Sequence, residues 1–172
     1  MDDQLRKIMG CTCMRMRRAT RRVTQLYDQV LEPAGLTANQ FGLLAYLQGA
    51  RMARPEASSI GTIAEWLGMD PSTLNRNLKP LEAKGLVRNA GDPADGRVRI
   101  VQITDLGQRV FLRAVPLWRG AQAQVDNALG LAATATLNQL LDVSASSVRS
   151  VGCFLREHKT YVEVPDQRGA YD

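Results

Sequence analysis

The stretch from Asp70 to Gly85 constrains the fold most, because it has the pattern of one amphipathic helix with defined ends. Asp70 is a good N-cap, since its carboxylate can accept hydrogen bonds from the free amides of the first turn. Pro71 suits the first helical position, where no amide donor is needed. Gly85 is placed to end the helix in a left-handed conformation. One face is apolar through three leucines at spacing i, i+4 and i+7: Leu74, Leu78 and Leu81.

The opposite face of this helix carries short polar and basic side chains, namely Ser72, Thr73, Asn75, Arg76 and Lys79. Side chains of this kind donate hydrogen bonds to phosphates and base edges, and no acid follows on this face before Glu82. A helix with an apolar back and such a front suits the major groove of DNA. Asn75 could contact adenine and Arg76 guanine in a bidentate manner, and either could instead contact phosphate.

The flanking segments complete a DNA-binding unit. Upstream, apolar residues over 60–67 predict a second short helix, and Gly68 allows a turn before Asp70, which is a helix-turn-helix arrangement. Downstream, residues 86–90 and 98–104 have strand character, and 91–97 form a turn-rich loop. This predicts a β-hairpin wing. Arg97 at its tip should enter the minor groove, where narrow A·T tracts attract guanidinium groups.

These motifs together resemble the MarR family of bacterial transcriptional regulators. Asp95-Gly-Arg97, followed by Val101, Ile103, Thr104 and Gly107, is similar to that family's wing signature. Ser72-Thr73-Leu74, with Leu81-Glu82-x-x-Gly85-Leu86-Val87, resembles its recognition helix and exit. The similarity runs from about Arg15 to Leu155. It implies a two-fold dimer with interleaved terminal helices, repression as the mode of regulation, and a salt bridge through which Asp95 orients the wing.

We therefore predict a mainly α fold with a small β-wing, built from two lobes. A winged helix-turn-helix DNA-binding lobe spans 36–104, and a helical dimerisation lobe combines 1–35 with 105–172. Outside the reading unit we expect helices over 11–31, 38–47, 104–128 and 132–156, and a loop over 49–58. Thr37 and Gln40 can form a capping box. Pro80 and Pro116 lie inside helical patterns, where each should produce a kink or, at Pro116, a break.

The terminal helices have apolar stripes that the reading unit does not cover, so a second copy of the chain is the expected partner. A symmetric dimer should bind a pseudo-palindromic operator in double-stranded DNA, with half-sites ~34 Å apart. The chain of 172 residues has a net charge of +5, which fits a polyanion partner. The sequence has no membrane-length apolar run and no secretory signal, so we expect a cytoplasmic protein with reduced thiols.

The signal that controls the regulator is open. On a helix, Cys11 lies with several arginines, which favour the reactive thiolate, whereas Cys13 falls on the apolar stripe. The two cysteines could sense oxidants, or alternatively they are packing residues. Cys13 resembles the sensing cysteine of the organic-hydroperoxide-responsive members of the family by its spacing to Gly35-Leu36-Thr37. Tyr27 matches one of the two assisting tyrosines of these members, and Ala38 replaces the other.

A small organic effector is the other main possibility, and its pocket could be lined by four aromatic residues that are otherwise core: Tyr46, Trp66, Phe111 and Trp118. A metal site from Cys11, Cys13, Cys153 and His158 has no recognised zinc spacing, so we predict no metal and no cofactor. An enzyme is disfavoured, because the single histidine leaves no obvious base for a nucleophile and no glycine-rich nucleotide loop is present.

Overall fold

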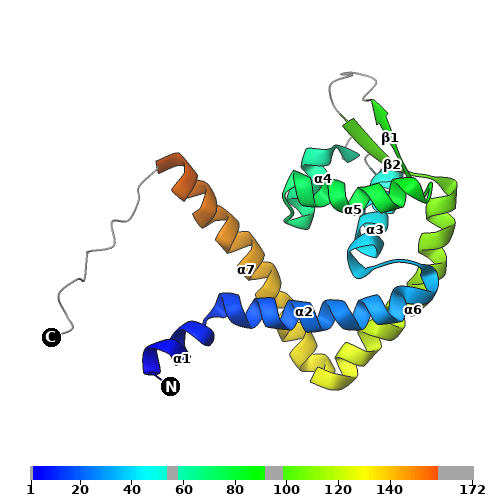
Figure 1. The fold of residues 1–172 in the computed structure, drawn as a ribbon. Coiled ribbons are helices and arrows are strands. Elements are labelled where there is room, and N and C mark those ends of the chain that lie inside the picture. Colours follow the sequence, from blue (N-terminus) through cyan, green and yellow to red (C-terminus); the bar gives the residue numbers. More distant parts are fainter. Residues whose placement is uncertain (1, 54–57, 92–98, 159–172) are drawn as a thin grey trace. The chain divides into compact units, whose positions relative to one another are not determined.

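The computed structural model describes residues 2–53, 58–91 and 99–158 (Figure 1). The described elements, in chain order, are α1 (Asp3–Met9), α2 (Thr12–Leu31), the 3-10 turn η1 (Glu32–Ala34), α3 (Ala38–Ala53), α4 (Ile60–Leu67), α5 (Pro71–Ala83), β1 (Val87–Gly91), β2 (Arg99–Ile103), α6 (Asp105–Leu129) and α7 (Leu131–His158). The chain divides into two compact units, residues 1–125 and 126–172. The predicted fold class, mainly α with a small β-wing, is confirmed. The predicted division into lobes at residues 35 and 104 stays a prediction.

The core of the first unit lies among α3, α4, α5 and the two strands. Its fully buried members include Leu31, Leu43, Leu44, Leu47, Ile63, Leu74, Leu78, Leu81 and Val101. The three leucines of α5 are at most 1% exposed. The predicted apolar face of this helix is therefore the face that packs inward, and it fixes which side chains point outward.

The helix ends follow the local signals in the sequence. Gln40 N donates to Thr37 Oγ1 and Thr37 N donates to Gln40 Oε1, which confirms the capping box before α3. Ser59 Oγ accepts from Thr62 N at 3.1 Å and caps α4. Gly68, just after α4, and Gly85, just after α5, have φ of 62° and 66°. Both residues adopt the left-handed conformation that glycine favours, which ends each helix.

Helix α3 is longer than the sequence pattern indicated. It continues to Ala53, so the predicted end at Leu47 and the loop from residue 49 are wrong for residues 48–53. Gly49 is a poor helix former, but Leu47 and Ala50 on either side of it are 1% and 8% exposed. Their burial offsets the cost of one glycine and carries the helix through.

The two prolines inside helices do not end them. α5 continues through Pro80 to Ala83, although an interior proline costs on the order of 3 kcal/mol in an isolated helix. Burial of Leu78 and Leu81 on either side of Pro80 offsets this cost. α6 also passes Pro116 without interruption, so the predicted break there is absent. The kink that Pro80 should produce in α5 stays a prediction.

The wing strands pair antiparallel, with Val87 opposite Ile103 and Asn89 opposite Val101. Ser59 adds a single antiparallel bridge to Ile100 of β2, and the pairing does not extend because Ile60 already begins α4. The predicted wing loop, including Asp95 and Arg97, lies outside the described residues. None of the helices in the described ranges is long and apolar enough to cross a membrane.

Candidate nucleic-acid interface

The first turn of α5 is held by a compact network around Asp70. Its Oδ1 accepts from Thr73 N at 2.9 Å and from Ser72 Oγ at 2.5 Å, and its Oδ2 accepts from Thr73 Oγ1 at 2.6 Å. The hydroxyl of Ser72 and then that of Thr73 hold the pKa of the Asp70 carboxyl well below its usual range. The sequence predicted Asp70 as the N-cap, but it did not predict that its carboxylate also accepts from the hydroxyls of Ser72 and Thr73. These hydroxyls are therefore oriented by Asp70 before any ligand arrives.

The network extends along the outward face of the helix. Arg76 Nη2 donates to Thr73 Oγ1 at 2.8 Å, which draws the guanidinium toward the N-terminal end of α5. Ser72, Arg76 and Lys79 are exposed, whereas Thr73 and Asn75 are half-buried. The five predicted contact residues thus share the outer side of one helix whose inner side is in the core. Their arrangement presents hydroxyl, amide, guanidinium and ammonium donors from a rigid element.

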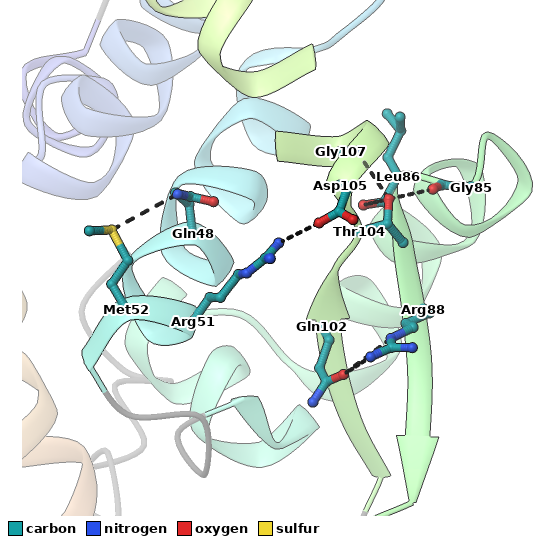
Figure 2. A network of polar contacts seen from close by, with 10 residues as sticks. All are labelled: Gln48, Arg51, Met52, Gly85, Leu86, Arg88, Gln102, Thr104, Asp105 and Gly107. Atoms are coloured by element: carbon teal, nitrogen blue, oxygen red, sulfur yellow. Dashed lines mark hydrogen bonds and ion pairs between the residues drawn. The ribbon is translucent and has the colours of Figure 1, made fainter. Parts of the chain in front are cut away.

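The root of the wing is tied to α6 through Thr104. Thr104 Oγ1 donates to Gly85 O at 2.7 Å and accepts from Gly107 N at 3.0 Å (Figure 2). Thr104 N donates to Leu86 O at 3.0 Å. A Cβ on Gly107 would overlap the Leu86 carbonyl oxygen and lie 2.9 Å from Ile103 Cγ1. Because α6 approaches the strands this closely, only glycine fits at position 107.

A second polar network beside the wing root was not predicted from the sequence. Arg51 Nη1 and Asp105 Oδ1 form an ion pair at 3.1 Å, which joins the last turn of α3 to the first residue of α6. Arg88 donates through Nε and Nη2 to Gln102 Oε1, at 3.2 and 2.9 Å, across the paired strands. In the sequence, these residues stand out only by lying near the ends of predicted elements. Such positions do not indicate a contact between residues 54 positions apart, such as Arg51 and Asp105.

The four aromatic residues proposed for an effector pocket fall into two groups. Phe111 and Trp118 of α6 pack against Phe41, with ring centroids 5.2 and 6.1 Å apart. Tyr46 pairs with Trp66 of α4 at 4.9 Å, and burial raises the pKa of Tyr46. Phe41 and Tyr46 are five residues apart on α3, which places them about 140° apart around the helix. A pocket shared by all four stays a prediction.

Both cysteines of the predicted redox pair are exposed in the single chain, at the start of α2. Cys11 is the N-cap residue and makes no side-chain capping bond. The metal alternative also involves Cys153 and His158, whose side chains lie outside the described part. Within the described part, no group of three or more His, Cys, Asp and Glu side chains is arranged to hold a metal ion.

Comparison with known proteins identifies the class. The MarR family model matches residues 34–98, from the start of the helix-turn-helix unit into the wing. The chain is similar to the crystal structure of the M. tuberculosis transcriptional regulator MosR in complex with DNA, with 32% identity and a TM-score of 0.71. That similarity covers 83% of this chain and 98% of the MosR chain. The chain belongs to the MarR family of transcriptional regulators, which are DNA-binding proteins and not enzymes.

Two further relatives agree with this assignment. The transcriptional repressor CouR, bound to a 23-mer DNA duplex, is 26% identical with a TM-score of 0.70, over 81% of this chain and 95% of that chain. The uncharacterized HTH-type transcriptional regulator YxaD of Bacillus subtilis (strain 168) is 34% identical over 91 residues. The matched region is 53% of this chain and 60% of YxaD, so the chain spans less than two thirds of that curated relative.

Proposed function

We propose that this chain is a homodimeric, sequence-specific DNA-binding regulator that uses α5 to read a pseudo-palindromic operator. The observation that carries the proposal is the two-sidedness of α5. Its leucines are at most 1% exposed, while Ser72, Arg76 and Lys79 point to solvent. The MosR and CouR structures contain DNA. Asp95 and Arg97 belong to the proposed contact surface through the wing. The protein would act in the cytoplasm, where its operator lies.

Exposed apolar side chains on the terminal helices support a homodimer. Along α7, Leu131, Leu137, Leu140, Leu141 and Val143 are between 42% and 75% exposed in the single chain. On α1 and α2, Leu5, Ile8, Met9, Met14 and Val23 are between 43% and 59% exposed. A second copy would remove this surface from water, and two-fold symmetry would present two α5 helices to one DNA duplex.

Repression, with release by a small organic effector, is the mode of action that we propose. CouR is described as a repressor, which supports the sign of regulation. The effector would contact two separate aromatic groups. One is Tyr46 of α3 with Trp66 of α4, and the other is Phe111 and Trp118 of α6.

A thiol-based oxidant sensor is the second candidate, because Cys11 and Cys13 are both exposed. Two thiols separated by one residue at a helix start could be oxidised to a disulfide, with two electrons and two protons passing to a peroxide. Changes at the start of α2 would then alter the dimer. This candidate predicts that operator binding depends on redox state.

The test is binding of the chain to its own upstream promoter DNA by fluorescence anisotropy, at stated salt. Arg76→Ala should weaken specific binding by ~10-fold or more, since a bidentate base contact is worth ~1–3 kcal/mol. Arg113→Ala, an exposed arginine on α6, is the matched control. Equal affinity in wild type and Arg76→Ala would contradict the reading role of α5.

Oxidation separates the two candidates. Binding that is lost after peroxide and recovered with reductant would favour the thiol sensor, and the Cys11→Ser, Cys13→Ser double variant should then be insensitive. Binding that is indifferent to peroxide would favour the small-molecule effector.

A further inference from the structure

A cavity of about 460 Å³ opens beside the wing root, between the end of α3, the two strands and the start of α6. Its volume is in the range of small-ligand pockets, roughly 300–1,000 Å³. Leu47 and Ile103, which are 1% and 5% exposed, supply apolar surface. The other six lining residues are polar or charged: Arg51, Ser58, Arg88, Gln102, Thr104 and Asp105. None of the residues proposed for DNA contact or for the aromatic effector groups lines this cavity.

The charge of the lining favours an anion. The lining contains the two guanidinium groups of Arg51 and Arg88 and the one carboxylate of Asp105, so it carries a net charge of +1. Figure 2 shows the Arg51 side chain extending from α3 toward Asp105, and the Arg88 side chain extending from β1 toward Gln102 on β2. A monoanion placed there would balance the charge of the cavity wall.

Both arginines retain capacity to bind a carboxylate. Arg88 uses Nε and Nη2 on the single oxygen Gln102 Oε1. A guanidinium carries five N–H donors, so Nη1 is not engaged by these bonds. Arg51 is paired with an Asp105 side chain that is 77% exposed, and exposed pairs of this kind are weak. A ligand carboxylate could therefore displace Asp105 or add to Arg88, with the planar two-oxygen geometry that arginine prefers.

We propose that this wing-root cavity binds a small polar monocarboxylate of the hydroxy-acid or sugar-acid class. The carboxylate would lie between Arg51 and Arg88, and hydroxyl groups would hydrogen-bond to Ser58 and Gln102. Such a ligand would connect α3, both wing strands and α6, and would hold the wing at one angle to the reading helix. Its regulatory consequence rests on the proposed DNA-binding function; its binding to the cavity does not.

The experiment titrates gluconate, a six-carbon sugar acid, into the full chain by isothermal calorimetry, with sorbitol as the neutral polyol control. We expect saturable binding of gluconate at millimolar concentration and none of sorbitol. Arg88→Gln should raise the dissociation constant at least tenfold, and Arg88→Lys by less, because lysine keeps the charge but loses the planar donors. Arg51→Gln should also weaken binding, and Arg113→Gln, outside the cavity, should not.

The outcomes are distinguishable. Absence of saturable gluconate binding, equal binding of sorbitol, or unchanged affinity in both cavity variants would overturn the site. Circular dichroism and the thermal midpoint of each variant establish that it is folded. Operator affinity is measured in parallel with and without gluconate, and we expect it to change in wild type but not in Arg88→Gln. Unchanged operator affinity with intact gluconate binding would overturn the regulatory role alone. Failure of the wild type to bind DNA would overturn the proposed function, while the calorimetry still decides the cavity.

Discussion

Helices α5 and α7 both carry leucines at helical spacing, but these leucines are buried in α5 and exposed in α7. Leu74, Leu78 and Leu81 of α5 are 0–1% exposed, because α3, α4 and the strands of the same chain cover them. Leu131, Leu140 and Leu141 of α7 are 75%, 59% and 44% exposed. The same residue type at similar spacing therefore forms a finished core in one region and an uncovered surface in the other.

This difference indicates where stability and assembly reside. Burial of α5 supports the fold of the DNA-binding unit within one chain. The apolar surface along α7 contributes to stability only when another surface covers it, because burial of apolar area stabilises the buried state by ~25 cal/mol per Å². We therefore expect substitutions in α5 to act on unfolding and substitutions in α7 to act on association.

The largest effect should come from Leu78→Ala, which removes a fully buried side chain from the covered face of α5. We expect the free energy of unfolding to fall by ~2–5 kcal/mol, since the loss of burial adds to the cost of a cavity. Urea denaturation measures it. Lys79→Ala, one position along on the exposed face, should leave stability nearly unchanged and weaken DNA binding instead. Equal destabilisation by both variants would mean that α5 is not two-sided.

Gly107→Ala tests how closely α6 packs against the DNA-binding unit. The added methyl group would overlap the Leu86 carbonyl, so we expect a loss of ~1–3 kcal/mol. Gly120→Ala is the matched control on the same helix, because its added Cβ would meet no atom within 4 Å beyond its chain neighbours and the helix's own backbone. This control should be neutral or stabilising by up to ~1 kcal/mol, as alanine is the better helix former. Thermal unfolding of both variants gives the comparison.

Leu140→Ala should act on association rather than on the fold of a single chain. If α7 is covered by a second copy, the dimer dissociation constant should rise ~10-fold or more, for a loss of at least ~1.4 kcal/mol. Sedimentation at several concentrations measures this constant. Asn138→Ala, at an exposed polar position of α7, is the control. An unchanged constant for Leu140→Ala would remove α7 from the proposed dimer interface.

The smallest effect concerns the pH dependence of the Asp70 cap. Hydrogen bonds from Ser72 and Thr73 lower the native pKa of Asp70 below its unfolded value, which is about 3.9. The stability it contributes is therefore present above about pH 4 and is lost as the pH falls toward the lowered native pKa. Asp70→Asn keeps the capping oxygen but does not titrate. The difference in unfolding midpoint between wild type and this variant should be constant near neutrality and shrink in acid; a pH-independent difference would contradict the charge effect.

Much of the DNA-binding unit could be predicted because its signals are local. The Asp70 cap, the Thr37 and Gln40 capping box, the glycine at position 85 and the α5 leucine stripe each depend on residues within one or two turns. The end of α3 could not be predicted in this way. Gly49 locally suggests a loop, and only packing of Leu47 and Ala50 against distant residues keeps the helix intact.

The candidate sites divide along the same line. The outward set on α5 follows from helical periodicity once its leucines face the core. The Arg51–Asp105 pair and the Arg88–Gln102 pair required the tertiary structure, because they join residues 54 and 14 positions apart. The tertiary structure also separated the aromatic residues into two groups, because Phe41 and Tyr46 project from different sides of α3. Phe111 and Trp118 pack against Phe41, and Trp66 packs against Tyr46.

By itself, the sequence predicted the order of the elements from α2 to α7 and the two-sided character of α5, because caps, periodicity and turn residues act over short range. The tertiary structure alone decided which apolar faces are covered within one chain, that α3 continues past Gly49, and that Arg51 and Arg88 both line the wing-root cavity. Those outcomes depend on long-range packing, whose free energy exceeds the local preferences of single residues.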